Sequence, residues 1–303
     1  MRGLVAAALA APAALAALGI GGCGGGGEDG APVTASTAAK APPRPALCAP
    51  LRATIAGRIA APAATELSGL VLSRSQPDVL WTHNDSGDRP RVLAVRPGGR
   101  LLADVALSGA AAFDWEDIAI GRGALLLGDI GDNLAQRESV SVYRVAEPRA
   151  GAGTATAQAT RIELRYAAGP RDAEALLADP RDGSLVIVEK RFDGRAGVYV
   201  AAPGARTLRR RARLALGVGE AVTAGDVSGD GRTVVLRTYD RAYVWTRRSG
   251  EPVAQALRRR PCSPPNDLLV EGQGEALALS RGGGAFYTVA EGSRPALRRY
   301  APR

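Results

Sequence analysis

The sequence predicts an all-β domain, a five-bladed β-propeller with four-stranded blades, and three observations carry this prediction. Five similar short segments recur along the chain, 48 to 58 residues apart. Each is followed by apolar, β-branched or alternating runs bounded by Gly, Pro and Asp, the pattern of short strands. A spare alternating segment also precedes the first repeat. Four strands in a unit of roughly 50 residues describe a propeller blade.

The first 22 residues are typical of a lipoprotein signal peptide. Arg2 is followed by an apolar run that is too short to span a membrane, and this run ends at Cys23. The residues from Ile20 to Cys23 resemble a lipobox, which implies acylation of Cys23. Ordinary secretory cleavage is the alternative. Residues 23–47 are rich in Gly, Ala, Pro and Thr, so we expect a flexible tether. The protein is therefore expected to be extracytoplasmic and lipid-anchored to the cell membrane.

Residues 48–303 are long enough for one propeller, and the spare strand offers a way to close it. The fifth unit ends after three strands, which would leave an open sheet edge. The alternating segment that begins at Leu51 and ends at Ile59 can supply the missing strand. Elsewhere we expect residues 252–257 to form the fourth strand of the fourth blade, and residues 149–159 to form a loop insertion.

The cysteine count and the net charge restrict the possible disulfides and binding partners. With Cys23 acylated, Cys48 and Cys262 remain in an oxidising compartment, where a disulfide is expected and two separate thiols are the alternative. The net charge is +9, and the densest arginine runs are residues 206–213 and 258–260. They favour an anionic surface polymer, lipid headgroups or a protein partner, or else form a solvated strand face. The few scattered aromatic residues argue against nucleic acid. We expect a monomer.

One position in each repeat is expected to reach the mouth of the central channel, because the first strand of every blade lines that channel. These third motif positions are Ser68, Glu116, Glu174, Gly225 and Glu275. Three carboxylates at one point repel each other, so either protons or a cation must offset their charge. Oxygen ligands alone suit Ca²⁺. The alternative is that these acids accept hydrogen bonds from neighbouring backbone N–H groups and hold no metal.

The order Ser, Glu, Glu, small residue, Glu resembles the calcium-activated nucleotidases (apyrases). That resemblance implies a five-bladed propeller with one calcium ion at the channel mouth, held at Ser68, Glu116, Glu174 and Glu275 in this sequence. The fourth repeat departs from the family pattern, because Gly225 stands where the family has a serine. The scaffold is also similar to the bacterial propellers described as phytase-like esterase or SdiA-regulated. Such scaffold similarity does not fix function.

The second strands are expected to end on the same face, where their tips make a polar rim. The rim offers a substrate-binding site, although Asp, Asn and Gly at strand ends also form local turns. Asp85 and Asp129 are the candidate catalytic residues. The expected substrate-binding residues are His83, Asn84, Asp85, Asp129, Asp132, Glu189, Lys190, Tyr239 and Glu291.

Three functions are compatible with these features. The first is a membrane-anchored binding module with a central Ca²⁺-type site. The second is a Ca²⁺-dependent phosphoester or nucleotide hydrolase, and the third is a glycosidase-like hydrolase with two carboxylates. A Ser-His-acid triad is disfavoured, because His83 is the single histidine and no G-x-S-x-G motif is present. The count of His and Cys excludes a zinc site built from them.

Overall fold

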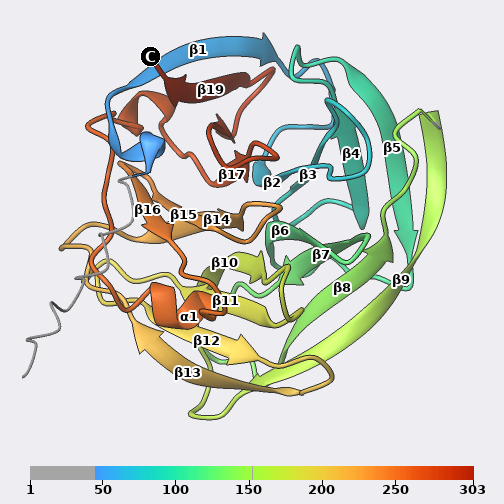
Figure 1. Cartoon of the computed structure of the whole chain (residues 1–303). Helices are drawn as coiled ribbons and strands as arrows, with labels where there is room; N and C mark the ends of the chain where they lie inside the picture. The colour runs from blue at the N-terminus through green and yellow to red at the C-terminus, as the bar shows by residue number, and fades with distance from the viewer. Residues whose placement is uncertain (1–44, 152) are drawn as a thin grey trace, which may run out of the picture. The chain divides into compact units, whose positions relative to one another are not determined.

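The computed structural model describes residues 45–151 and 153–303. The predicted signal peptide, Cys23 and most of the tether lie outside the described residues. The described part is nearly all β and propeller-like, with antiparallel groups of strands arranged around a common centre (Figure 1). Among these residues no helix has the length and apolar character needed to cross a membrane.

The strands pair in groups that follow the chain. The first group is β2 (Leu67–Leu72), β3 (Leu80–Asn84), β4 (Arg91–Val95) and β5 (Leu101–Ser108). The second is β6 (Trp115–Gly121), β7 (Ala124–Asp129), β8 (Val140–Ala146) and β9 (Gly153–Tyr166). The third is β10 (Ala173–Ala178), β11 (Leu185–Glu189), β12 (Gly197–Ala201) and β13 (Thr207–Arg213).

The last two groups depart from a simple meander. The fourth has three strands, β14 (Val222–Val227), β15 (Thr233–Thr238) and β16 (Ala242–Thr246). The final group is β17 (Ala276–Leu279), β18 (Phe286–Val289), β19 (Ala296–Pro302) and the N-terminal β1 (Leu51–Arg58). Short helical segments are η1 (Ala46–Cys48), α1 (Val253–Ala256) and η2 (Leu269–Glu271).

The N-terminal strand pairs with the C-terminal one, as the sequence predicts. β1 runs antiparallel to β19, from Leu51 opposite Pro302 to Arg58 opposite Ala296. The Asn266 side chain holds the start of β1, because its Oδ1 accepts from the Leu51 N–H at 2.9 Å and its Nδ2 donates to the Leu51 carbonyl at 3.1 Å. β1 thus covers the sheet edge that β19 would otherwise expose.

The first strand of each group lies innermost and is almost wholly buried. β2 contacts β6, β6 contacts β10, β10 contacts β14, β14 contacts β17, and β17 contacts β2 again. The apolar core lies between successive sheets; the largest side chains between the first two are Trp81, Trp115 and Tyr143. Because the innermost strands contact one another in a closed circuit, their first residues are brought to one place.

Two predicted elements differ in the structure. Residues 252–257 are not a strand but contain α1, with the Leu257 N–H donating to the Val253 carbonyl at 3.0 Å. The apolar residues of this segment follow helical spacing, and Pro252 at the N-cap has no N–H to leave unpaired. Residues 153–158 are not a loop, because this part of β9 pairs in parallel with Ala103–Ser108 of β5.

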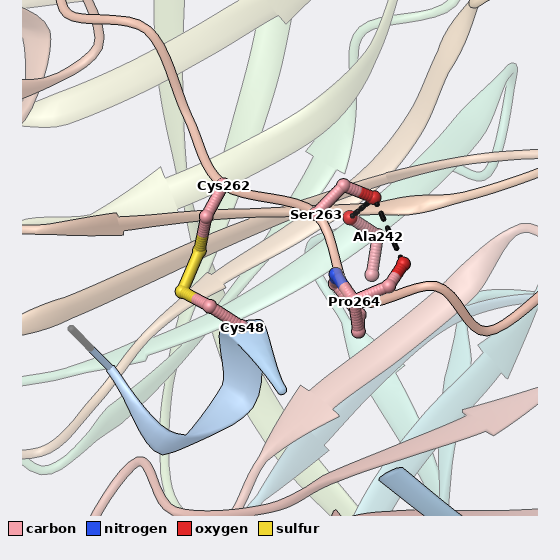
Figure 2. Close-up of a disulfide and its surroundings, with 5 residues drawn as sticks. All are labelled: Cys48, Ala242, Cys262, Ser263 and Pro264. Carbon is pink, nitrogen blue, oxygen red and sulfur yellow. Dashed lines mark hydrogen bonds between the residues drawn. A yellow bond between two sulfur atoms is a disulfide. The ribbon is translucent and has the colours of Figure 1, made fainter. Parts of the chain in front are cut away.

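The predicted disulfide is present between Cys48 and Cys262, whose Cα atoms are 5.6 Å apart (Figure 2). It joins η1 to the segment that follows α1. Next to it, the Ser263 hydroxyl donates to the Ala242 carbonyl at 2.8 Å. Leu47 in η1 is also buried, so the folded part includes the last residues of the predicted tether.

Candidate functional site

The repeat motif is the place where each innermost strand bulges. In four groups the register between first and second strands shifts by one residue at the motif position. The residue left without a partner in these four groups is Ser68, Glu116, Glu174 or Thr223. A bulge re-aims one side chain away from the regular alternation of a strand. In the last group Glu275 directly precedes β17.

The structure therefore places Thr223, rather than Gly225, at the motif position of the fourth group. Thr223 is fully buried, and its hydroxyl donates to the Gly274 carbonyl at 3.1 Å. Ser68 also donates to the next group of strands, to the Glu116 carbonyl at 2.5 Å. Gly225 lies two residues further along β14, where its N–H donates to Asp117 Oδ2 at 3.2 Å. The order of motif residues is thus Ser, Glu, Glu, Thr, Glu.

Asp117 and Asp226 fasten the innermost strands to one another. Asp117 Oδ2 accepts from the Leu176 N–H at 3.0 Å, besides the bond from Gly225. Asp226 Oδ2 accepts from the Leu279 N–H at 2.8 Å. Burial raises the pKa of both carboxyl groups, most of all that of Asp117. These two acids hold neighbouring innermost strands together. The acids at the motif positions are left as candidates for the expected ion site.

Asp85 joins two groups of carboxylates at this mouth. One group is Asp85, Glu275 and Glu291, and the other is Asp85, Asp114 and Glu116. In each, the oxygens lie within 4.8 Å of one another. Asp85 directly follows β3, Asp114 directly precedes β6, and Glu291 follows β18. Strand starts and strand ends from neighbouring sheets therefore supply one continuous set of carboxylate oxygens.

Burial and mutual repulsion raise the pKa values of these acids. Burial is the larger cause at each of them. Burial, with the charges of Glu275 and Asp114, raises the pKa of Asp85 to about 6. Burial and the charge of Glu275 raise the pKa of Glu291 to about 7. Burial and the neighbouring Glu174 raise the pKa of Glu116 well above its usual value. These carboxyl groups therefore hold protons at higher pH than ordinary carboxylates, which shows that their ionised forms are disfavoured at this place.

Glu174 and Glu275 are partly compensated by two rim residues. Lys190 forms an ion pair with Glu174 Oε1, and its ammonium lies 5.6 Å from the centre of the Tyr239 ring. The Tyr239 hydroxyl donates to Glu275 Oε1 at 2.8 Å. Glu174 Oε2 is buried and has no hydrogen-bond partner among the described residues. Burial still raises the pKa of Glu174 to about 8, although Lys190 opposes the shift.

Several predicted rim residues are engaged in local structure. Asn84 Nδ2 donates to Asp88 Oδ2 at 2.8 Å, and Asp132 accepts from two backbone N–H groups in its own loop. Asp129 Oδ1 accepts from Arg137 at 2.8 Å, and Glu189 Oε2 accepts from the Gly197 N–H at 2.9 Å. Asn84, Asp129 and Glu189 are the last residues of β3, β7 and β11, and the polar atoms named here are already paired.

His83 lies beneath the rim rather than on it. Its side chain is buried, and its ring meets the Trp115 ring edge-on with centroids 5.4 Å apart. Its Nδ1 lies 2.8 Å from the Asn84 carbonyl oxygen. Burial lowers its pKa to about 4, so it is neutral at physiological pH. This environment is that of a packed core residue.

The residues that sequence reasoning missed are Asp114 and Thr223. Asp114 stands two positions before Glu116 in the same motif, and a direct comparison of the repeats could have included it. Sequence comparison misses Thr223 because it places the motif position of the fourth repeat two residues too late, at Gly225. The apolar strand that follows Thr223 gives the correct alignment, since Ala224 corresponds to Asp117, Ala175 and Ala276.

The oxygen donors at the mouth fit a hard cation. Asp85, Asp114, Glu116, Glu275 and Glu291 can hold it, and Glu174 Oε2 is an additional buried donor without a partner. No nitrogen or sulfur ligand belongs to either carboxylate group, and all-oxygen sites suit Ca²⁺ better than the transition metals. The set is also more acidic than the predicted one, because Asp85, Asp114 and Glu291 join it.

No protein-family model matches the sequence, and no curated protein matches it. Solved structures resemble it in fold. A gluconolactonase from Xanthomonas campestris is 15% identical over 86% of this chain and 97% of its own, with a TM-score of 0.45. The WD40 repeats of RRP9 are 11% identical over 84% of this chain and 100% of their own, with a TM-score of 0.44.

A third solved structure is a protein of unknown function from Bacteroides thetaiotaomicron. It is 10% identical over 83% of this chain and 76% of its own, with a TM-score of 0.46. Likenesses at this level carry no argument about activity. They assign no family to this chain, which is a β-propeller-like protein with an acidic cluster where its innermost strands begin.

Proposed function

We propose that this protein is an extracytoplasmic binding module, a five-bladed β-propeller whose channel mouth holds a calcium ion. The closed circuit of innermost strands and the pairing of β1 with β19 support five blades. The lipobox-like residues before Cys23 support a lipid anchor at the cell membrane. Thr223 supports the resemblance to the calcium-activated nucleotidases, because it places a hydroxyl residue at the motif position where that family has serine.

The observation that carries the cation site is the sharing of Asp85 between two carboxylate groups. Oxygens of several acids within 4.8 Å of one another repel, and partial burial strengthens this repulsion. A divalent cation would offset the repulsion and return the pKa values toward their usual range. When bound, Ca²⁺ would supply positive charge that can also attract an anionic group of a ligand.

In this proposal the surrounding residues set the shape of the site. The strand bulges aim Glu116 and Glu174 toward the mouth, and Tyr239 orients Glu275 by its hydrogen bond. The Arg137–Asp129 pair supports the loop that follows β7, beside Asp114. Asp85 belongs to both carboxylate groups, so its removal should disturb the site most.

The test is thermal melting of the exported chain with its disulfide intact, in EDTA and with added Ca²⁺. A ligand that binds the folded state stabilises it by RT ln(1 + [L]/Kd), about 2.7 kcal/mol at a hundredfold excess over Kd. We expect Ca²⁺ to raise the melting temperature of the wild type and not that of Asp85→Asn. Asp78→Asn is the matched control, because Asp78 is exposed and lies outside both carboxylate groups. An unchanged wild-type melting temperature would remove the calcium site.

A Ca²⁺-dependent phosphoester hydrolase is the second candidate, and one observation favours it. Asp85 belongs to both carboxylate groups, so its carboxylate would lie beside the proposed cation, where it can accept a proton from an attacking water. Assays of nucleoside di- and triphosphates with Ca²⁺ test it. Turnover that Asp85→Asn abolishes and Asp78→Asn preserves would establish the enzyme. Absence of turnover in a protein that binds Ca²⁺ leaves the binding module.

A further inference from the structure

The fourth group of strands leaves a hollow where the other groups have an outer strand. The outer edge of β16 is met by one isolated bridge, between Val244 and Cys262. The chain instead forms α1 and then returns past β16 as residues 258–262. The space between β13, β16 and this returning segment is a groove of about 950 Å³.

Arginine dominates the lining of this groove. Its charged members are Arg213, Arg258, Arg259 and Arg260, and no acidic residue is among the lining residues. Arg259 pairs with the nearby Glu251 and donates to the Thr246 carbonyl at 2.6 Å. Among the described residues, the other three have no carboxylate within 4.0 Å. The groove therefore carries about three uncompensated positive charges.

The arginines are held at different points along the groove. Arg258 donates twice to the Arg211 carbonyl, at 3.0 and 2.5 Å, which ties the end of α1 to β13. Arg213 ends β13, and Arg260 lies two residues before Cys262, which the disulfide fixes. Arg213 and Arg260 are exposed. Guanidinium groups spread over a concave surface suit a chain that bears anionic groups at intervals.

We propose that this arginine groove binds a linear polyanion that carries repeated phosphate groups. A flat bilayer fits it less well, because the arginines line a hollow between walls. A nucleic acid fits it less well, because the aromatic lining residues Tyr243 and Trp245 are only 8% and 2% exposed and offer no face for base stacking. The groove is distinct from the acidic mouth and shares no residue with it.

The experiment measures binding of a short inorganic polyphosphate by isothermal titration across a range of salt concentrations. EDTA is present throughout, so that no cation at the acidic mouth contributes. The double variant Arg213→Gln/Arg260→Gln is expected to weaken binding about tenfold. It should also lower the slope of log K against log[salt] by about 1.4, from two lost contacts at about 0.7 each.

The matched control is Arg52→Gln/Arg299→Gln, which removes the same charge from exposed positions on β1 and β19. It should leave binding within about twofold of the wild type. An equal loss in both double variants would show that net charge alone attracts the polymer and would overturn the proposal. Tighter binding to phosphatidylglycerol vesicles, lost in Arg213→Gln/Arg260→Gln, would overturn it in favour of a membrane surface.

Discussion

Replacing Asp85 by Asn should stabilise the metal-free protein, although it removes the residue at the centre of the proposed site. The reason is that burial and the charges of Glu275 and Asp114 raise the pKa of Asp85 from 3.8 to about 6. A raised pKa means that the folded state resists ionisation of this group. An Asn side chain has nearly the same shape and no charge, so it avoids that cost.

The size of the expected stabilisation follows from the shift in the pKa of Asp85. A difference of about two pKa units corresponds to about 3 kcal/mol at 1.36 kcal/mol per unit. Asp85 is partly exposed, so solvent screening reduces this to about 1.5 kcal/mol. For a domain of this size we expect a melting temperature about 3 to 6 °C higher in Asp85→Asn at pH 7 in EDTA.

The pH dependence gives an independent check of the sign. Because the folded-state pKa is the higher one, stability is greatest below the unfolded pKa of about 4 and falls as pH rises to about 6. Melting curves in EDTA between pH 4 and pH 7 should therefore show less loss with rising pH in Asp85→Asn than in the wild type. Asp78→Asn should follow the wild type. A variant no more stable than the wild type at pH 7 would refute the reasoning.

The remaining predictions concern groups outside the mouth. Replacing Cys48 and Cys262 by Ser should destabilise the protein by up to about 5 kcal/mol, measured by urea unfolding, because the bridge spans 214 residues. Glu271→Gln should cost about 3–5 kcal/mol in the same assay, since it leaves the fully buried Arg237 guanidinium without its carboxylate. The His83 imidazole should show no titration above pH 5 by NMR, because burial lowers its pKa to about 4, whereas titration near 6.5 would place it in solvent.

The repeat and the closing strand could be predicted because each is a local pattern. Alternating residues bounded by turn residues mark the strands, and β1 alternates in the same way as the strands it joins. The segment 252–257 could not be assigned in this way, because its six residues fit both alternation and helical spacing. Residues 153–158 resemble a loop in sequence because the stretch to which they belong is rich in Gly, Ala and Thr. Their partner strand β5 lies about 50 residues earlier in the chain and determines their conformation.

The repeat in the sequence led to Glu116, Glu174 and Glu275, which stand at the starts of three innermost strands. Their role as ligands stays a prediction. The ion pair of Glu174 with Lys190 and the central place of Asp85 depend on how strand ends from different sheets approach one another. Spacing along the chain does not encode that approach. The exchange of Gly225 for Thr223 shows how a shift of two residues alters the expected ligand set.

The length of β9 has a consequence for how the molecule opens. Its first half pairs with β5, its second half with β8, and its last two residues, Arg165 and Tyr166, with β13. One uninterrupted strand thus connects the first three groups of strands along their outer edges. Amide exchange in these three groups should proceed as one cooperative unit, whereas the group of β14, β15 and β16, which β9 does not pair with, is free to open separately.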